Sequence, residues 1–368
     1  MEKETSASQG SSQEKASMAS MMQSKESTMK AMRFHEFGGP EVLSYEDVPR
    51  PAPNFGEALV RVKAASLNHI DIWVEKGSYY KPNLPHIPGS DAAGIVEEVK
   101  DADSSLVDRK VIVYPTLACF HCRCCIEGNH NLCASYKTLG AQVDGSYAEY
   151  VTVPVKNLIG MPANLKFEEA AALPLTFTTA YHMLVDRAKL QPHETVLVLG
   201  AGSGVGSAAI QIASLLGANV IATSSSEEKL RKAQRIGADI VINYSEDGWT
   251  DEVMAATKNK GVDVVIDHVG AATFTSSIKC LAKNGRLVTC GVTTGNETSI
   301  NIRELFMVQR SILGSVSGTM KDFMAVTRLA AEGKIKPLLD SVYRLREARK
   351  AQERLLSRQS FGKIVLVP

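Results

Sequence analysis

The sequence has almost no net charge and no apolar run long enough to cross a membrane. Its 368 residues include 41 Lys and Arg against 40 Asp and Glu, a formal net charge of +1. A balanced charge gives no reason to expect nucleic acid or an anionic membrane surface as a partner. No apolar run approaches the roughly 18 residues that a transmembrane helix needs, so a membrane protein is not predicted.

Cysteine is scarce outside one short segment. Five of the seven cysteines fall between Cys119 and Cys133. This clustering is unlike a disulfide framework spread along a chain and points to a metal site. Thiolate ligands fit a reducing compartment, so we expect a cytoplasmic protein.

Branched apolar residues are missing from the first 28 residues, which are rich in Ser, Met, Gln, Lys and Glu. Such a composition cannot bury a core, so residues 1–28 are expected to form a disordered tail. The tail also lacks the roughly 7–15-residue apolar stretch of a secretory signal.

The remaining length, and a change of pattern along it, predict two domains. From Met29 to about Pro154, short strands alternate with Pro- and Gly-rich turns, which is typical of a compact, mainly β domain. From Thr195 to about Leu313, strands and helices alternate regularly, as in an α/β fold with a doubly wound parallel sheet. Helices and a closing strand, Lys363–Val367, follow.

The stretch Glu194–Ala218, ETVLVLGAGSGVGSAAIQIASLLGA, contains the clearest motif. Thr195–Leu199 is a short apolar run typical of a strand buried on both faces, and apolar residues repeat at helical spacing from Val205 onward. The turn between them contains Gly200, Gly202, Gly204 and Gly206. A strand, glycine turn and helix N-terminus together cradle a pyrophosphate, so we predict a dinucleotide site here rather than a plain tight turn.

The row LACFHCRCCIEGNHNLC has a C-x2-C-x2-C-x7-C spacing. Four thiolates complete a tetrahedral zinc site with no open position, so the predicted metal is structural. The predicted ligands are Cys119, Cys122, Cys125 and Cys133. Cys124 is a bystander or a ligand in a shifted register, and His121 and His130 are expected at the surface. The alternative is a set of reactive or disulfide-bonded cysteines. Cys280 and Cys290 lie in predicted elements and are expected in the core.

From Met29 to Pro368 the chain resembles the medium-chain dehydrogenase/reductase superfamily. The resemblance is carried by GGPEVL (Gly38–Leu43), LNHID (Leu67–Asp71), PGSDAAGIVEEV (Pro88–Val99), the cysteine cluster, GAGSGVG (Gly200–Gly206) and FGKIVL (Phe361–Leu366). It implies a discontinuous GroES-like domain with a structural zinc lobe, residues 29–174 plus 317–368, and a Rossmann domain, residues 175–316. It also implies hydride transfer between a nicotinamide cofactor and a carbonyl, alcohol or conjugated alkene.

The zinc-dependent alcohol dehydrogenases of this family hold a second, catalytic zinc, and the resemblance places its ligands at three positions of this chain. Those positions carry Asn68, Ser90 and Leu175. Asn and Ser are poor zinc ligands and leucine is none. His69, Asp71 and Asp91 lie nearby in sequence, and their rebuilding of a second metal site is an alternative. The chain thus resembles a hybrid, with the zinc lobe of alcohol dehydrogenases and the zinc-free active site of quinone oxidoreductases.

Without a catalytic metal, hydride delivery to a quinone or conjugated carbonyl is easier than alcohol oxidation, because the acceptor already spreads the incoming charge over a carbonyl. The resemblance implies that Asn68 orients the substrate carbonyl, that Tyr79 lines the pocket beside Tyr80, and that Thr179 contacts the cofactor near the nicotinamide. For the tyrosines, an ordinary half-buried aromatic is the alternative, and a threonine inside a helix needs no function.

The position about 20 residues past the glycines, which carries an acid in NAD-preferring folds, is Ser224 here. A serine would not repel a 2′-phosphate, and the resemblance implies that Lys229 and Tyr244 hold one. Against this, Glu227 and Glu228 add negative charge, and Ser225 with Glu228 has the spacing of a capping box, which leaves Lys229 as a solvated helix residue. The sequence favours NADPH over NADH.

Three further cofactor residues follow later strands, at the rim where the nicotinamide half should rest: His268, Gly270 and Gly291. The primary expectation is therefore an NADPH-dependent reductase of quinones or conjugated carbonyls with one structural zinc. The alternatives are a zinc-dependent alcohol or aldehyde dehydrogenase with an atypical site, and a nucleotide-binding structural protein like zeta-crystallin. The expected partners are a small-molecule acceptor and further copies of the chain, in a homodimer or homotetramer.

Overall fold

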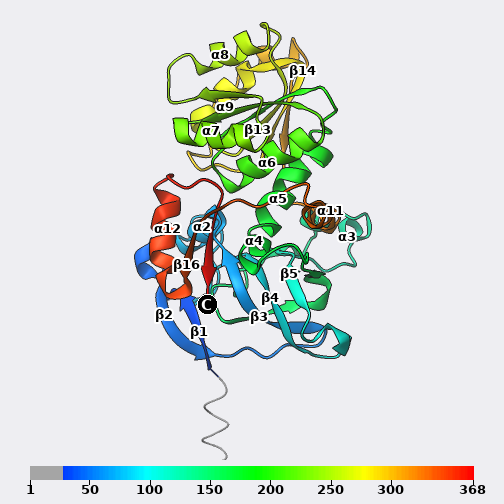
Figure 1. Ribbon diagram of the computed structural model, residues 1–368, viewed down its shortest axis with the longest axis vertical. Helices are drawn as coiled ribbons and strands as arrows, with labels where there is room; N and C mark the ends of the chain where they lie inside the picture. The colour runs from blue at the N-terminus through cyan, green and yellow to red at the C-terminus, as the bar shows by residue number, and fades with distance from the viewer. Residues whose placement is uncertain (1–27) are drawn as a thin grey trace, which may run out of the picture.

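The computed structural model of the protein describes residues 28–368, which form two bodies joined end to end (Figure 1). The predicted tail lies outside the described residues except for Thr28. That residue starts strand β1 (Thr28–Arg33) and pairs with Pro49 of β2 (Ser44–Pro49), so the boundary of the tail is one residue too late. None of the helices in the described part is long and apolar enough to cross a membrane.

The upper body in Figure 1 contains a six-stranded sheet in the order β12-β11-β10-β13-β14-β15, with every pair parallel. Its strands are β10 (Thr195–Val198), β11 (Asn219–Ser224), β12 (Ile240–Asn243), β13 (Val262–Asp267), β14 (Leu281–Thr289) and β15 (Ser311–Gly314). The order turns back at β10, as in a doubly wound dinucleotide-binding sheet. The predicted fold class is confirmed.

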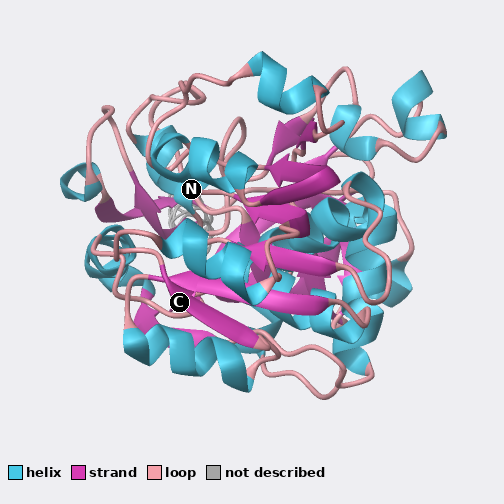
Figure 2. Ribbon diagram, turned by 90° about the horizontal axis from the view of Figure 1, so that it is seen from above, coloured by secondary structure: helices cyan, strands magenta, loops and turns pink. Residues whose placement is uncertain are grey.

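Helices cover both faces of this sheet (Figure 2). They are α6 (Gly204–Leu215), α7 (Glu227–Arg235), α8 (Trp249–Ala256) and α9 (Ala271–Lys279), and a short, exposed helix, α10 (Ile302–Phe306), precedes β15. Since both faces are covered, the central strands are apolar on both sides. The capping box predicted at Ser225 is wrong: Ser226 is the residue before α7, and its side chain makes no capping hydrogen bond.

The lower body contains a seven-stranded, mainly antiparallel sheet in the order β16-β17-β3-β4-β5-β9, with β8 paired to β3. Its strands are β3 (Glu57–Ser66), β4 (Asp91–Val99), β5 (Lys110–Val113), β8 (Tyr150–Pro154), β9 (Leu158–Gly160), β16 (Leu339–Arg344) and β17 (Lys363–Val367). β17 pairs with β3, so the end of the chain completes a sheet that the first third begins.

A smaller lobe protrudes from this body between β6 (Thr116–Leu117) and β7 (Lys137–Thr138), which pair with each other. It contains α3 (Arg123–Ile126) and all the clustered cysteines, and we call residues 116–138 the cysteine lobe. The other helices of the lower body are α2 (His69–Glu75), α4 (Phe167–Ala171), α11 (Met320–Ala331) and α12 (Ala348–Leu356).

Helix α5 (Pro174–Tyr181) crosses from the lower body to the upper one (Figure 1) and continues into a π-helical turn, His182–Arg187. One apolar cluster runs through it: Phe177 and Met183 pack in the same core as Ile112 of β5 and Val198 of β10. The two bodies therefore share a core. We propose domain boundaries near residues 174 and 317, where the chain passes from one body to the other.

A buried carboxyl group joins α2 to α12. Glu75 is fully buried, and its Oε2 accepts a hydrogen bond of 2.9 Å from Nε2 of Gln352. Its Oε1 and the Oε1 of Gln352 have no partner among the described residues. Burial, with the charges of Asp71 and Glu41, raises the pKa of Glu75 to about 8.

We predict that Glu75→Gln stabilises the protein at alkaline pH. A carboxyl whose pKa is raised on folding favours folding most below its unfolded pKa of about 4.3, and this contribution is lost as pH rises through about 8. A glutamine carries no charge to bury. The melting temperature of Glu75→Gln, relative to wild type, should rise at pH 8.5 by clearly more than at pH 5.

The control is Glu353→Gln on α12, which removes an exposed carboxylate from the same helix. Its melting temperature should track wild type at both pH values. Equal effects of Glu75→Gln at pH 5 and pH 8.5 would contradict a buried, pH-dependent group.

Candidate active site

A cavity of about 710 Å³ opens between the two bodies, along the carboxyl edge of the parallel sheet. It extends from Tyr244, after β12, past the glycine turn to the segment after β15, and the lower body lines its other wall. Open α/β sheets bind ligands at this edge, where the strand order turns back. All three predicted catalytic residues line it: Asn68, Tyr79 and Thr179.

The glycine turn is shaped for close approach of a ligand. Gly200 has φ of 60°, which favours glycine. A β-carbon on Gly206 would lie 2.3 Å from the carbonyl oxygen of Gly200, so the helix can start this close to the strand only without one. Ser203 caps α6 by accepting a 2.8 Å hydrogen bond from N–H of Gly206. The first turn of α6 thus faces the cavity with its N-terminus, where backbone donors favour an anion.

Most of the predicted cofactor residues lie together on this wall. Those that line the cavity are Gly200, Gly202, Gly204, Val205, Ser224, Lys229, Tyr244, His268 and Gly291. Among the described residues, Gly206 and Gly270 are the two predicted ones that do not. Gly206 packs against the backbone of Gly200 within the turn. Gly270, with φ of 95°, precedes α9 and packs against the backbone of Val292 and Gly295.

A buried lysine lies in the lower wall of the cavity. Nζ of Lys363 donates to the carbonyl of Leu67 (2.7 Å), to Oδ1 of Asn68 (2.5 Å) and to Oδ2 of Asp91 (3.3 Å). Burial lowers the pKa of Lys363, and the Asp91 and Asp71 carboxylates oppose this shift. An ammonium group with three acceptors is satisfied, so it can stay charged away from water.

Asn68 is engaged in the same network. Its Nδ2 donates to Oδ2 of Asp91 (2.9 Å) and, more weakly, to the carbonyl of Ser66 (3.4 Å), while its Oδ1 faces Lys363. The predicted orienting residue thus borders the cavity with its strongest hydrogen bonds already made inside the protein.

The two aspartates suggested as substitute metal ligands are also engaged. Asp91 accepts from Ser66 (2.8 Å) and from the N–H of Leu175 (2.9 Å), besides Asn68 and Lys363. Asp71 accepts hydrogen bonds from the backbone N–H of Asn68, the residue before α2, from the hydroxyl of Tyr147 (3.0 Å) and from the hydroxyl of Ser90 (3.2 Å). Burial raises the pKa of Asp71 to about 6. Across residues 28–368, the four cysteines are the one group of three or more His, Cys, Asp or Glu with converging ligand atoms.

No aspartate or glutamate of the described chain lines the cavity, whereas four basic residues do: Lys76, Lys229, Arg358 and Lys363. This excess of positive charge suits an anionic ligand. His69 also lines the cavity; burial, and then the positive charges of His268 and Lys363, lower its pKa to about 4, so it is neutral near pH 7.

Aromatic side chains form the outer wall of the cavity. Tyr79 is half exposed and contacts Tyr80 edge-on, with ring centroids 4.6 Å apart, and Trp73 at 5.9 Å. Tyr136, from the cysteine lobe, lies on the same wall and bonds Thr138 at 2.8 Å. Flat, apolar rings favour a planar acceptor. Of the two cysteines predicted in the core, Cys280 is fully buried. Cys290 is only half buried and lines the cavity, which the sequence did not predict.

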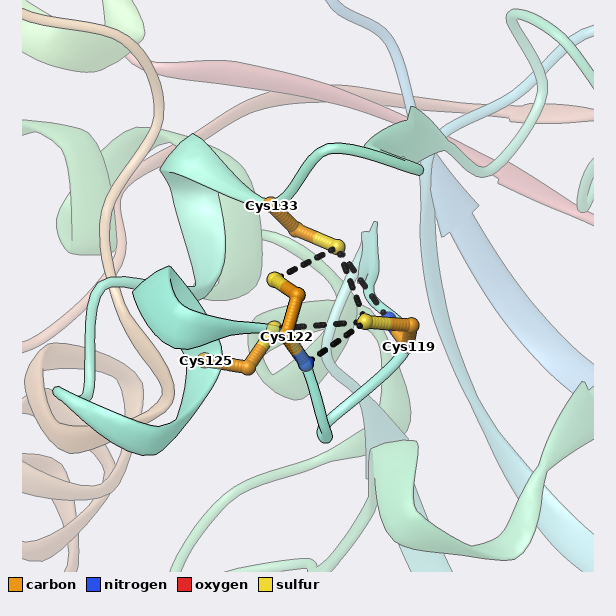
Figure 3. A group of neighbouring side chains, drawn as sticks. All are labelled: Cys119, Cys122, Cys125 and Cys133. Carbon is orange, nitrogen blue, oxygen red and sulfur yellow. Dashed lines mark hydrogen bonds between the residues drawn. The ribbon is translucent and has the colours of Figure 1, made fainter.

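The four predicted zinc ligands converge in the cysteine lobe (Figure 3). Their Sγ atoms all lie within 4.8 Å of one another, and the closest pairs are 3.5 to 3.9 Å apart. A tetrahedral zinc with Zn–S bonds of about 2.3 Å needs sulfurs about 3.8 Å apart, so the group fits this metal. Cys124 is not part of it, and His121 is exposed.

Sequence reasoning missed Lys363 and Arg358 as site residues. Lys363 belongs to the FGKIVL motif. A charged residue at the start of an otherwise apolar strand could have indicated that this lysine is buried and paired. Arg358, with φ of 56°, lies beside Lys229, whose Nζ donates to its carbonyl oxygen.

Two family models match the chain: the alcohol dehydrogenase GroES-like domain over residues 54–163, and the zinc-binding dehydrogenase over residues 204–332. An alcohol dehydrogenase of Geobacillus stearothermophilus is 36% identical over 346 residues, which cover 92% of this chain and 99% of that protein. A quinone oxidoreductase of Rattus norvegicus is 33% identical over 348 residues, covering 92% and 98%.

The chain belongs to the zinc-type medium-chain dehydrogenase/reductase superfamily. A crystal structure of an NAD-dependent alcohol dehydrogenase, 44% identical, matches with a TM-score of 0.90 over 92% of this chain and all of the other. A crotonyl-CoA carboxylase/reductase, 28% identical, matches with a TM-score of 0.86 over 93% of this chain and 88% of the other. The lower body is the GroES-like domain of this superfamily and the parallel sheet its Rossmann domain. The protein is a nicotinamide-dependent oxidoreductase of this family.

Proposed function

We propose that this dehydrogenase/reductase reduces quinones or conjugated carbonyls with NADPH and uses no catalytic zinc. One observation carries the proposal: around the cavity, the described residues offer no group of metal ligands, because Asp71 and Asp91 are held in hydrogen bonds and Asn68 contacts Lys363. The cofactor, when bound, supplies the hydride. An acceptor that is already electrophilic needs only orientation and a hydrogen-bond donor at its oxygen.

Three residues of this chain could do that work. Thr179 is buried on α5 and lines the cavity, so its hydroxyl can donate to the oxygen of a bound acceptor. Tyr79 can pack against a planar acceptor and offer its phenol. Asn68 is held in place by hydrogen bonds to Lys363 and Asp91. We therefore propose that it shapes the floor of the cavity and makes that floor polar, rather than donating a hydrogen bond to the acceptor.

We propose that one zinc ion is held by Cys119, Cys122, Cys125 and Cys133 and takes no part in the chemistry. The sulfur spacing fits, and four thiolates leave no position for substrate. Thiolate ligands favour a reducing compartment, which supports a cytoplasmic location.

The preference for NADPH is supported by charge near Ser224, at the end of β11. Lys229, Arg358 and Tyr244 line the cavity with Ser224, and no acid does. Glu228, counted against NADPH in the sequence, forms an ion pair of 2.7 Å with Lys232 on the surface of α7. A 2′-phosphate would meet positive charge here. Several relatives are named NAD-dependent alcohol dehydrogenases, so NADH remains the competing cofactor.

The first test combines a substrate panel with a metal count on the same sample. We expect one zinc per chain, and NADPH oxidation with quinones or enones that exceeds oxidation of alcohols with NADP⁺. Two zincs per chain, with activity lost on chelation, would instead support a zinc-dependent alcohol dehydrogenase. Tight NADPH binding with no turnover of any acceptor would favour a nucleotide-binding structural protein.

We predict that Ser224→Asp shifts the cofactor preference toward NADH. A carboxylate at this position repels a 2′-phosphate and binds a ribose 2′-hydroxyl. The ratio of kcat/KM for NADPH to kcat/KM for NADH should fall about tenfold or more, as a like-charge contact of 1–2 kcal/mol would produce. The control is Ser245→Asp, an exposed cavity residue further along the same rim. An unchanged ratio in Ser224→Asp would contradict the assignment of the ribose site.

We propose that the chain forms a homodimer or homotetramer through the free edge of β15. This strand is the last of its sheet, and α10 before it exposes Ile302, Phe306 and the adjacent Met307 by more than 60% each. An open strand edge beside apolar side chains invites pairing. Light scattering should give twice or four times the chain mass of 39.7 kDa, and a monomer at micromolar concentration would contradict the proposal.

A further inference from the structure

The segment that connects the sheet to α11 forms part of the cavity wall. Residues 315–319, which we call the connector, follow β15 and carry the chain back to the lower body. Ser315, Val316 and Ser317 line the cavity. Because the adenosine half of the cofactor belongs near β11, the connector lies at the opposite end, beside the nicotinamide and the acceptor.

The connector has a conformation that needs external support. Ser317 has φ of 49°, in the left-handed region that non-glycine residues seldom adopt, and such strain persists only where surrounding contacts impose it. A β-carbon on Gly318 would lie 2.7 Å from Cγ2 of Thr178, so the connector packs directly against α5.

The cysteine lobe and its base supply that support. Nδ2 of Asn131, a buried residue two positions before the ligand Cys133, donates to the carbonyl of Val316 at 2.9 Å. Oγ1 of Thr116, at the base of the lobe, lies 3.1 Å from Oγ of Ser317. Just before the lobe, the hydroxyl of Tyr114 donates to the carbonyl of Gly318 at 2.5 Å.

A buried histidine extends the contact to α5 and α11. Nδ2 of Asn131 also donates to Nε2 of His182 (3.2 Å), and Nδ1 of His182 donates to Oδ2 of Asp322 (2.8 Å). Asp322 in turn accepts from Thr319, the residue that caps α11. His182 opens the π-helical turn that ends α5, a local irregularity often found at functional sites. Both ends of the connector are thus fixed by residues that converge on Asn131.

We propose that the cysteine lobe, through Asn131, positions the connector and with it the nicotinamide end of the cavity. A metal in the lobe then does more than stabilise the fold: it fixes the loop that contains Asn131 and so sets the wall against which cofactor and acceptor meet. Asn131 is a positioning residue, since it touches neither ligand and acts through Val316 and His182. The kinetic part of this inference rests on the proposed function.

The test is Asn131→Leu, which keeps the size of the side chain and removes the amide. The matched control is Asn164→Leu, because Nδ2 of Asn164 donates to the carbonyl of Ala330 at the other end of α11, away from the connector. We expect Asn131→Leu to retain one zinc per chain and to bind NADPH within about threefold of wild type. Its kcat/KM for the best acceptor should fall at least about tenfold, as small misplacements of a reacting pair can cause. Asn164→Leu should keep wild-type kcat/KM.

Hydrogen exchange of peptides covering 312–320 gives a readout independent of activity. Exchange should rise in Asn131→Leu and in wild type after zinc chelation, and chelation should add little in Asn131→Leu, since both act through one contact. Unchanged exchange in Asn131→Leu, or an equal increment on chelation in both proteins, would overturn the proposal. If Asn131→Leu loses zinc, Asn131→Ala replaces it in the same comparison. Absence of turnover in wild type would refute the proposed function alone, because the exchange result would still stand.

Discussion

One ammonium group, Nζ of Lys363, joins the last strand of the protein to the first part of its active site. It donates to Leu67 and Asn68 ahead of α2 and to Asp91 of β4, residues 272 to 296 positions away in sequence. A buried charge is costly unless paired, and removing either partner leaves the other uncompensated. The closure of the seven-stranded sheet by β17 and the floor of the cavity therefore depend on the same ion pair.

The same pair keeps Asp91 and Asn68 from serving as free metal ligands beside the cavity. Asp91, which does not itself line the cavity, accepts four hydrogen bonds, and Asn68, which does, uses both ends of its amide. The cavity is also lined by aromatic rings, by Thr179 and by four basic residues. Such a site suits a phosphate-rich cofactor and a planar, electrophilic acceptor.

Sequence patterns predicted the parts of this structure that depend on local chemistry. The glycine turn was predictable because a strand, four glycines and a helix adjoin one another, and each glycine answers a steric demand such as that of Gly206 against Gly200. The cysteine spacing was predictable for the same reason, since all four ligands lie within 15 residues. The capping box expected of Ser225 and Glu228 was wrong, because α7 starts at Glu227 and Ser226, not Ser225, takes the capping position.

Contacts between distant segments were beyond local reasoning. Lys363 and Asp91 are 272 residues apart, and Asn131, His182 and Asp322 come from three separate elements. Asn68 illustrates the difference. The family resemblance implies a role for this residue, and only the fold shows that its amide groups already make hydrogen bonds within the protein. A polar residue at an active-site position is available to a substrate only when its own neighbours leave a donor or acceptor free. By that criterion Asn68 is better suited to shaping the cavity than to contacting a substrate directly, although the resemblance implied such a contact.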